Sequence, residues 1–286
     1  MGDSPRYLVV NADDLGLHQD INRGIRSAHT EGIVTSTSIV ASGSAFEDAC
    51  RVLEDCPALD VGVHLTLIEE RPVLDPWVVP SLVTSDRVFP SSYRALSERV
   101  FRRAVNRDDV ARELRAQIER VLEAGIVPSH VDSHQHVHVL EPIRQVAIDL
   151  AEEYRIPFIR VPSFESPLSS WRRLPDPVFR IGLNYLSGRT RRQVRWLRHA
   201  DRTALLHRSG HITADNLLMV IDALNPGVTE IVAHPGITTP DLSDTYRWAF
   251  DWSGEVDALT SSAVRERTAP GDIHLVGFRD LIARSV

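Results

Sequence analysis

Five acidic and imidazole side chains lie within or directly after short β-rich runs of the sequence. They are Asp13, Asp14, His64, His134 and His234. In α/β proteins the carboxyl ends of parallel strands meet on one face, so we expect these side chains to lie close together. Two imidazoles and one carboxylate are a common ligand set for a catalytic divalent metal that leaves positions open for water and substrate. The residue types therefore predict a catalytic metal site.

The strongest single signal is a cluster of histidines, because four of the twelve fall between positions 130 and 138. In an extended segment His134, His136 and His138 would point to the same side. The nearby Asp132 can accept a hydrogen bond from one ring and so orient it. We expect a metal ligand in this segment and substrate contacts from His136 and His138.

Each of the other features also has an ordinary structural explanation. The pair Asp13 and Asp14 can simply cap the helix that follows a strand. A lone buried histidine such as His64 is commonly a hydrogen-bonded core residue. His234-Pro235-Gly236 is also a plain turn sequence. Only the combination of these features points to one site.

The composition excludes several classes of function. All 32 basic residues are arginine, so sites that need a lysine amine, such as P-loops, Schiff-base enzymes and pyridoxal enzymes, are ruled out. A net charge of −7 provides no general attraction for nucleic acid. The apolar runs are far shorter than the about 20 residues of a membrane span, and the first six residues lack a signal-peptide pattern. We expect a cytoplasmic protein with no nucleic-acid partner and no transmembrane segment.

Short β-rich runs alternate with amphipathic helices along most of the chain, which predicts a parallel α/β architecture. The expected strands cover residues 7–10, 33–40, 59–67, 129–132, 158–161, 230–233 and 273–277. The expected helices include one that ends near Gly32, and others at 46–55, 142–154, 213–224 with Thr213 as N-cap, and one from the N-cap Asp108 to Gly125. Residues 71–95 are rich in proline and serine and predict a loop.

The alternation is lost between residues 164 and 210. Nine arginines lie from Arg172 to Arg202 against only two aspartates. This segment is either a basic lid over an anionic substrate or lipid surface, or a solvated helical insertion. Because arginine must supply every positive surface charge here, the second interpretation is favoured. We predict a single domain over residues 1–286 with an arginine-rich insertion at about 164–210.

The chain resembles the YdjC/ChbG-type carbohydrate deacetylases in five motifs, which occur in the family's order from the first strand to about residue 260. The motifs are Asn11–Gly16 (NADDLG), Gly32–Ser38 (GIVTSTS), Gly62–Leu65 (GVHL), His130–His138 (HVDSHQHVH) and His234–Gly236 (HPG). The resemblance implies a distorted β/α barrel of the TIM type. It also implies a divalent metal and hydrolysis of an N-acetyl group from an amino sugar or its oligomer, as in chitooligosaccharide deacetylases.

The resemblance also assigns roles. Asp14, His64 and His134 match the family's metal ligands, Asp13 matches the general base, and His234 would be the general acid. The family implies Mg²⁺, whereas the imidazoles would also suit Zn²⁺. Because neighbouring strand residues point to opposite faces, the roles of Asp13 and Asp14 could be reversed. A homodimer is compatible with the sequence.

Further candidates surround this set. Arg160 follows a predicted strand and is expected to contact substrate, to orient a carboxylate or to form a structural ion pair. Trp248 is expected to stack on a sugar ring, as Trp77 and Trp252 could, although aromatic residues more often fill cores.

Two other functions fit the same residues. A barrel phosphoesterase would also use Asp and His ligands, but two-metal enzymes of that kind need more carboxylates than these motifs offer. A non-catalytic sugar-binding or metal-sensing protein would have little need for a base, a metal and an acid on one face. The sequence therefore favours a metal-dependent carbohydrate deacetylase.

Overall fold

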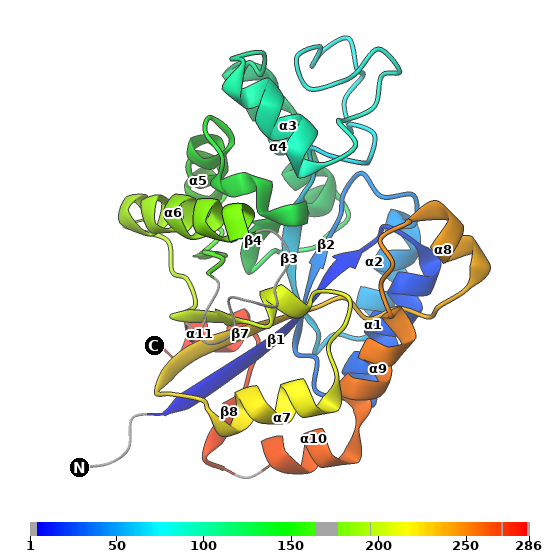
Figure 1. Ribbon diagram of the computed structural model, residues 1–286, viewed down its shortest axis with the longest axis vertical. Coiled ribbons are helices and arrows are strands. Elements are labelled where there is room, and N and C mark those ends of the chain that lie inside the picture. The colour runs from blue at the N-terminus through cyan, green and yellow to red at the C-terminus, as the bar shows by residue number, and fades with distance from the viewer. Residues whose placement is uncertain (1–4, 164–176, 195, 270, 285–286) are drawn as a thin grey trace.

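The computed structural model describes residues 5–163, 177–194, 196–269 and 271–284. Eight parallel strands form a curled sheet surrounded by helices, as Figure 1 shows. The strand order is β5-β4-β3-β2-β1-β7-β6, and β8 pairs with the beginning of β1. This is a distorted β/α barrel, which confirms the predicted fold class.

The strands are β1 Arg6–Leu15, β2 Ser36–Ile39, β3 Asp60–Leu65, β4 His130–Ser133, β5 Phe158–Ile159, β6 Arg202–Ala204, β7 Gly227–Ala233 and β8 Ile273–Leu275. The helices are α1 Gln19–Thr30, α2 Phe46–Asp55, α3 Tyr93–Phe101, α4 Arg107–Glu123, α5 Ile143–Glu153, α6 Pro177–Gln193, α7 Ala214–Asp222, α8 Pro240–Thr245, α9 Trp252–Thr260, α10 Ser262–Thr268 and α11 Phe278–Ala283. Two short 3₁₀ segments, η1 His134–Val139 and η3 Leu206–Arg208, follow β4 and β6.

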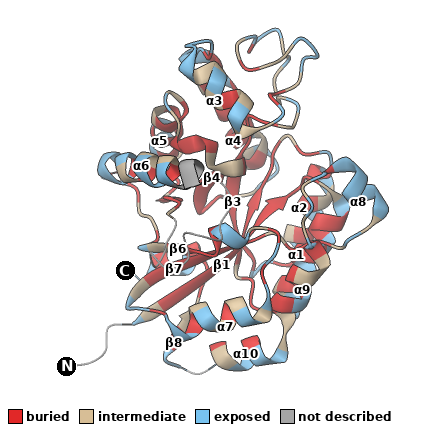
Figure 2. Ribbon diagram, in the orientation of Figure 1, coloured by how far each residue is buried: buried red, intermediate tan, exposed pale blue. Residues whose placement is uncertain are grey.

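Strand β1 runs through the middle of the sheet and is buried on both faces (Figure 2). Its residues Tyr7 and Val9 pack in a cluster with Phe158 inside the barrel. Leu8 and Val10 face the other way, into the larger core against the surrounding helices. Because strand side chains alternate between faces, the inward stripe that begins at Tyr7 continues to Asp13 at the carboxyl end. The fold thus places Asp13 inside the mouth of the barrel.

Most predicted elements are present, with corrections at their ends. The N-cap of α4 is Asn106 and not Asp108, because the Asn106 side chain accepts a hydrogen bond from the backbone N–H of Asp108 at 2.7 Å. The predicted cap Thr213 is confirmed and forms a capping box with Asn216. The predicted loop at 71–95 ends earlier, since α3 begins at Tyr93.

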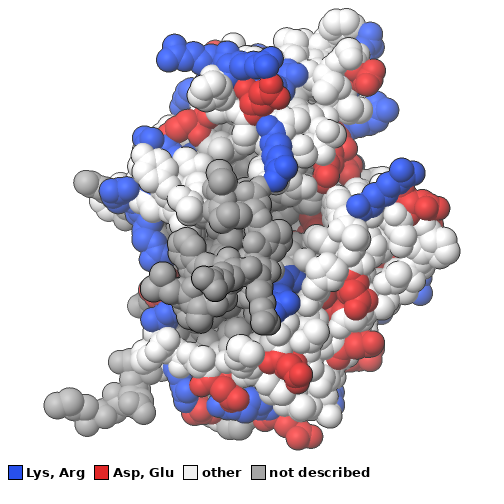
Figure 3. Space-filling model, viewed as in Figure 1, with Lys and Arg blue, Asp and Glu red and all other residues white. Residues whose placement is uncertain are grey.

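The arginine-rich range 164–210 contains α6 and β6, while its first part, 164–176, lies outside the described residues. Arg189, Arg191 and Arg192 of this range are exposed to solvent. Figure 3 shows basic and acidic side chains interspersed around this face of the molecule. These positions agree with the solvated helix more than with a concentrated basic surface.

Among the described residues, no helix is both long enough and apolar enough to cross a membrane.

Candidate active site

The two aspartates at the end of β1 reach the same side of the sheet because the strand turns between them. Asp14 has a φ of 74°, and the pairing with β2 shifts register between Ala12 and Leu15. Aspartate tolerates this left-handed conformation better than most residues. The irregularity lets Asp14 turn back toward the barrel mouth, next to Asp13. Because of this turn, Asp13 and Asp14 need not point to opposite faces of the sheet although they are neighbours in the strand.

Asp14, His64 and His134 converge at the carboxyl ends of β1, β3 and β4. The Asp14 Oδ1 atom lies 3.0 Å from Nδ1 of His134 and 3.4 Å from Nε2 of His64. All three residues are buried, with 1 to 6% of their surface exposed. The predicted ligand set is therefore brought together by the fold.

Asp132 holds the His64 ring, whereas the sequence predicted only that Asp132 could orient one imidazole near the histidine cluster. Its Oδ1 lies 2.7 Å from His64 Nδ1, because His64 and Asp132 are register partners in β3 and β4. Its Oδ2 accepts a hydrogen bond from Ser38 Oγ at 2.7 Å. This arrangement turns the opposite ring nitrogen, Nε2, toward Asp14.

The cluster has a strongly negative environment. Burial alone would lower the pKa of both imidazoles, but Asp132 and Asp13 raise that of His64 to about 10, and Asp14 raises that of His134 to about 9. Burial alone would raise the pKa of Asp14, yet the two histidines hold it well below its usual value. Surroundings that favour a proton on each ring also favour a bound cation in place of those protons.

Two sets of residues in the described part of the chain have metal-ligand spacing, and they share His64. One is Asp14 with His64 and His134, and the other is Asp13 with His64 and Asp132. The second set already contains a cation, because the Arg160 guanidinium is bonded to both of its carboxylates. The first set offers one oxygen and two nitrogens with no such competitor, and this donor chemistry fits a divalent metal.

Arg160 lies at the centre of the carboxylate network. Its NH1 and NH2 groups donate to the two oxygens of Asp13 at 2.7 and 2.8 Å, and its Nε donates to Glu230 at 2.7 Å. The Arg160 side chain is fully buried. Of the predicted roles, the structure supports the orientation of a carboxylate and a structural ion pair, and contact with substrate stays a prediction.

The segment after β4 is not extended, so the expectation that three alternate histidines share one side is wrong. Gln135 and His136 adopt left-handed conformations inside η1, with φ values of 49° and 58°. His138 is fully buried, with Nδ1 2.5 Å from Ser133 Oγ and Nε2 2.9 Å from the Arg160 carbonyl oxygen. Both of its ring nitrogens are engaged within the fold, which does not support the predicted substrate contact.

His136 lines a groove between η1, α3 and α6, together with Tyr93 and Leu183. Burial lowers the pKa of His136 well below its usual value. Its Nδ1 has no hydrogen-bond partner in the described part of the chain. The substrate contact predicted for His136 stays a prediction.

His234 directly follows β7 and lies level with Asp13 of β1, since Ala233 and Ala12 are register partners. Its Nδ1 is buried and has no partner among the described residues. A Cβ on Gly24 would lie 2.3 Å from Gly236 Cα, so the turn after His234 packs directly on α1. This close packing fixes the position from which the imidazole projects.

A row of aromatic rings runs from His134 to His234. Trp248 lies 5.2 Å from the His134 ring and 5.4 Å from Phe250, and Phe250 lies 5.3 Å from the His234 ring, all measured between centroids. Trp248 thus lies beside the ligand set, and its predicted stacking on a sugar ring stays a prediction. Trp252 is buried in the core and Trp77 is 70% exposed, beneath Arg87.

Three glutamates of the site were missed by the sequence analysis. Glu69 contacts His134 at 2.9 Å, Glu230 contacts Arg160, and Glu255 accepts a hydrogen bond from the His234 backbone N–H at 2.5 Å. Burial raises the pKa of Glu230 to about 7. Glu230 could have been identified from the sequence as an inward residue of the predicted strand 230–233. Glu69 could have been identified as a carboxylate just beyond the predicted strand 59–67.

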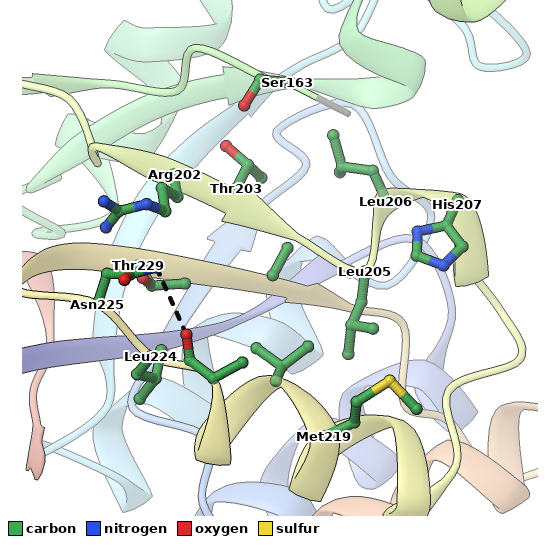
Figure 4. A pocket seen from close by; sticks show the side chains of 13 residues that line it. Ser163, Arg202, Thr203, Leu205, Leu206, His207, Met219, Leu224, Asn225 and Thr229 are labelled. Carbon is green, nitrogen blue, oxygen red and sulfur yellow. Dashed lines mark hydrogen bonds between the residues drawn. The ribbon is translucent and has the colours of Figure 1, made fainter. Parts of the chain in front are cut away.

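A separate cavity lies between β6 and α7, outside the sheet (Figure 4). Leu205, Leu206 and Met219 contribute to its lining together with Arg202 and Thr229. None of the residues predicted for the site lines it. The chemistry described above is therefore independent of this cavity.

The chain is similar to known proteins both in sequence and in fold. The family model described as YdjC-like protein matches residues 7–269. A carbohydrate deacetylase of Geobacillus stearothermophilus is 32% identical over 277 residues, covering 96% of this chain and 98% of the relative. One from Halalkalibacterium halodurans is 40% identical over 173 residues, covering 60% and 70%. A crystal structure from Enterococcus faecalis V583, described as a candidate cellobiose-phosphate cleavage protein, has a TM-score of 0.81 at 28% identity and covers 97% of this chain and 99% of that one.

Proposed function

The chain belongs to the YdjC-like family, and from this premise we propose that it is a metal-dependent carbohydrate deacetylase that removes the N-acetyl group of an amino sugar or its oligomer. The full-length match to relatives named carbohydrate deacetylase supports the reaction class. The observation that carries the proposal is the convergence of Asp14, His64 and His134 beside a second, separately held carboxylate, Asp13.

An amide is a poor electrophile and its amine a poor leaving group, so hydrolysis needs an activated water, a stabilised oxyanion and a proton donor. A divalent ion held by Asp14, His64 and His134 would supply the first two by acidifying a bound water and polarising the acetyl carbonyl. We expect one such ion per chain, with Mg²⁺ and Zn²⁺ as the candidates. Residues of the chain must accept the proton of the water and donate a proton to the leaving nitrogen.

Asp13 is suited to accept the proton of the attacking water. Arg160 holds its carboxylate by two hydrogen bonds, and Asn11 Nδ2 donates a third to Asp13 Oδ1 at 2.8 Å. These contacts fix the orientation of the carboxylate beside Asp14, as a positioned base requires. We therefore assign Asp13 as base and Asp14 as metal ligand.

His234 is suited to protonate the departing sugar nitrogen. It follows the strand next to β1 and is half-buried, and its buried Nδ1 has no hydrogen-bond partner among the described residues. The buried Glu255 anchors its backbone N–H, so the acid is held by a fixed turn. Trp248 and Phe250, which lie between the two histidines, would form the wall against which a sugar ring stacks.

A two-metal phosphoesterase is less well supported. Its second ion would have to occupy the set of Asp13, His64 and Asp132, where the Arg160 guanidinium already neutralises the carboxylates. A metal count per chain distinguishes the two functions, because the deacetylase requires one ion.

The proposal is tested by incubating the purified chain with N-acetylglucosamine oligomers and a divalent metal and measuring released acetate. Equal amounts of acetate and free amino sugar are expected. The absence of acetate with every N-acetylated sugar tested at full metal occupancy would contradict it. The small-molecule sugar partner, the homodimer and the cytoplasmic location predicted from the sequence stay predictions.

A further inference from the structure

We propose that Glu69 is a positioning residue that fixes the His134 ring for metal binding. The same carboxylate also connects this ring to Trp248, the side chain that we place against the sugar ring. The inference rests on the proposed function, since it concerns the same metal site. Glu69 lies beyond the end of β3 and belongs to none of the five motifs described above.

The first observation is a symmetry between the two imidazoles. His64 directs Nε2 toward Asp14 and has Asp132 on Nδ1, whereas His134 directs Nδ1 toward Asp14 and has Glu69 on Nε2. Each ring thus has one nitrogen facing the ligand set and one on its own carboxylate. A carboxylate in that place fixes the ring tautomer and raises its basicity toward a metal. Glu69 does for His134 what Asp132 does for His64.

The second observation is that both Glu69 oxygens are used within the site. Oε2 accepts hydrogen bonds from His134 at 2.9 Å and from Gln135 Nε2 at 3.3 Å. Oε1 accepts one from Trp248 Nε1 at 3.3 Å. One carboxylate therefore holds a proposed metal ligand and the indole that we place against the sugar ring.

The third observation is the backbone of Glu69, which has a φ of 64°. A left-handed conformation is unfavourable for an ordinary side chain and persists where the surroundings demand it. Hydrogen bonds between Glu69 N–H and the Pro90 carbonyl, at 2.8 Å, and between Phe89 N–H and the Glu70 carbonyl, at 3.0 Å, hold the turn. Asp14 shares this conformation, so two of the strained residues of the chain lie at one site.

The neighbouring Glu70 provides a matched control. It has the same charge and accepts a hydrogen bond from Tyr246 at 2.8 Å, not from a proposed metal ligand. Replacing either glutamate by glutamine removes one negative charge near the cluster. Only the change at Glu69 weakens the acceptor of the His134 ring.

The test measures the affinity of the full chain for Zn²⁺ alone by competition with a chromophoric chelator. Glu69→Ala should lower the affinity roughly 10- to 100-fold, the usual effect of removing the partner of a metal-bound histidine. Glu69→Gln, which keeps an acceptor, should lose less, and Glu70→Gln should stay within about twofold of the parent. In acetate release, both Glu69 variants should also raise KM, because the Trp248 wall loses its anchor.

Equal affinities for Glu69→Ala and Glu70→Gln would overturn the inference. If Glu69→Ala does not fold, an unchanged affinity of Glu69→Gln together with an unchanged KM overturns it equally. Failure of the parent chain to bind Zn²⁺ or Mg²⁺ would instead remove the proposed function, so the two failures are distinguishable.

Discussion

Substitution of Arg160 by methionine is expected to be among the most damaging single changes in the protein. The arginine binds Asp13, Asp132 and Glu230 at 2.7 to 2.8 Å, and no atom of its side chain is exposed. Methionine fills much of the same volume but provides no charge and no donor. Three buried carboxylates would then lose their shared cation.

The magnitude follows from these contacts. Removing one partner of a buried ion pair typically costs about 3 to 5 kcal/mol, because the remaining charge stays buried without compensation. We expect a loss of at least this size in the free energy of unfolding at pH 8. Arg160→Lys keeps the charge but not the paired hydrogen bonds to Asp13, so it should lose less.

The loss should depend on pH. In the parent, Arg160 and His64 hold the pKa of Asp132 below its usual value despite burial, so this stabilisation is present at neutral pH and lost on acidification. In Arg160→Met the buried carboxylates have no compensating cation, so their ionisation is unfavourable and the variant should lose stability as pH rises. The difference between parent and variant should therefore be larger at pH 8 than at pH 5.5.

Urea unfolding of parent, Arg160→Met and Arg160→Lys at both pH values measures these differences. A loss below about 1 kcal/mol at pH 8 would mean that the network is not the buried ion cluster described here. A loss of the same size at both pH values would refute the electrostatic reasoning in particular.

Three further predictions concern other residues. Asp13→Asn should lower acetate release roughly 10²- to 10⁴-fold with metal affinity unchanged; loss of the metal instead would show that Asp13 is a ligand. His234→Ala should strongly reduce hydrolysis of an N-acetyl sugar but affect an aryl acetate much less, since a phenolate leaves without a proton; equal losses would rule out general-acid catalysis by His234. Burial lowers the pKa of His138 to about 4, below the 6.5 expected when unfolded, so acidification from about pH 6.5 to 4 should cost up to about 3 kcal/mol of stability through this residue. His138→Gln should show a shallower pH dependence of urea unfolding, and an unchanged slope would contradict the assignment.

The framework of the site could be predicted because it depends on local pattern and on one rule of topology. Apolar runs of strand length locate β1, β3 and β7, and the carboxyl ends of parallel strands meet on one face. That rule brings His64 and His134 to one face, whereas Asp14 joins them through the turn at the end of β1. The pairing of Asp132 with His64 comes from the structure, in which they are register partners in β3 and β4.

The arrangement after β4 could not be predicted in this way. Whether residues 134–138 are extended or turned depends on the left-handed conformations of Gln135 and His136. Neither residue type signals such a turn. The consequence was that His138, assigned to substrate, proved to be a buried residue bonded to Ser133 and Arg160.

The roles of Arg160, Glu69 and Glu255 depend on contacts between distant parts of the chain. Arg160 meets Asp13 across 147 positions, and Glu69 meets His134 across 65. A single sequence shows that a charge is present but not which partner neutralises it. The buried network therefore required the structure, although strand alternation already predicts that Asp13 can face inward.

The central claim is that one divalent ion held by Asp14, His64 and His134 is required to release acetate from an N-acetylated sugar. The most direct measurement is a titration of chelator-treated, metal-free protein with Zn²⁺ or Mg²⁺, recording bound metal and the rate of acetate release from N-acetylglucosamine oligomers together. Activity should rise in proportion to binding and level off at one ion per chain, and His64→Ala should show neither. Full acetate release by the metal-free protein, or by His64→Ala without bound metal, would contradict it.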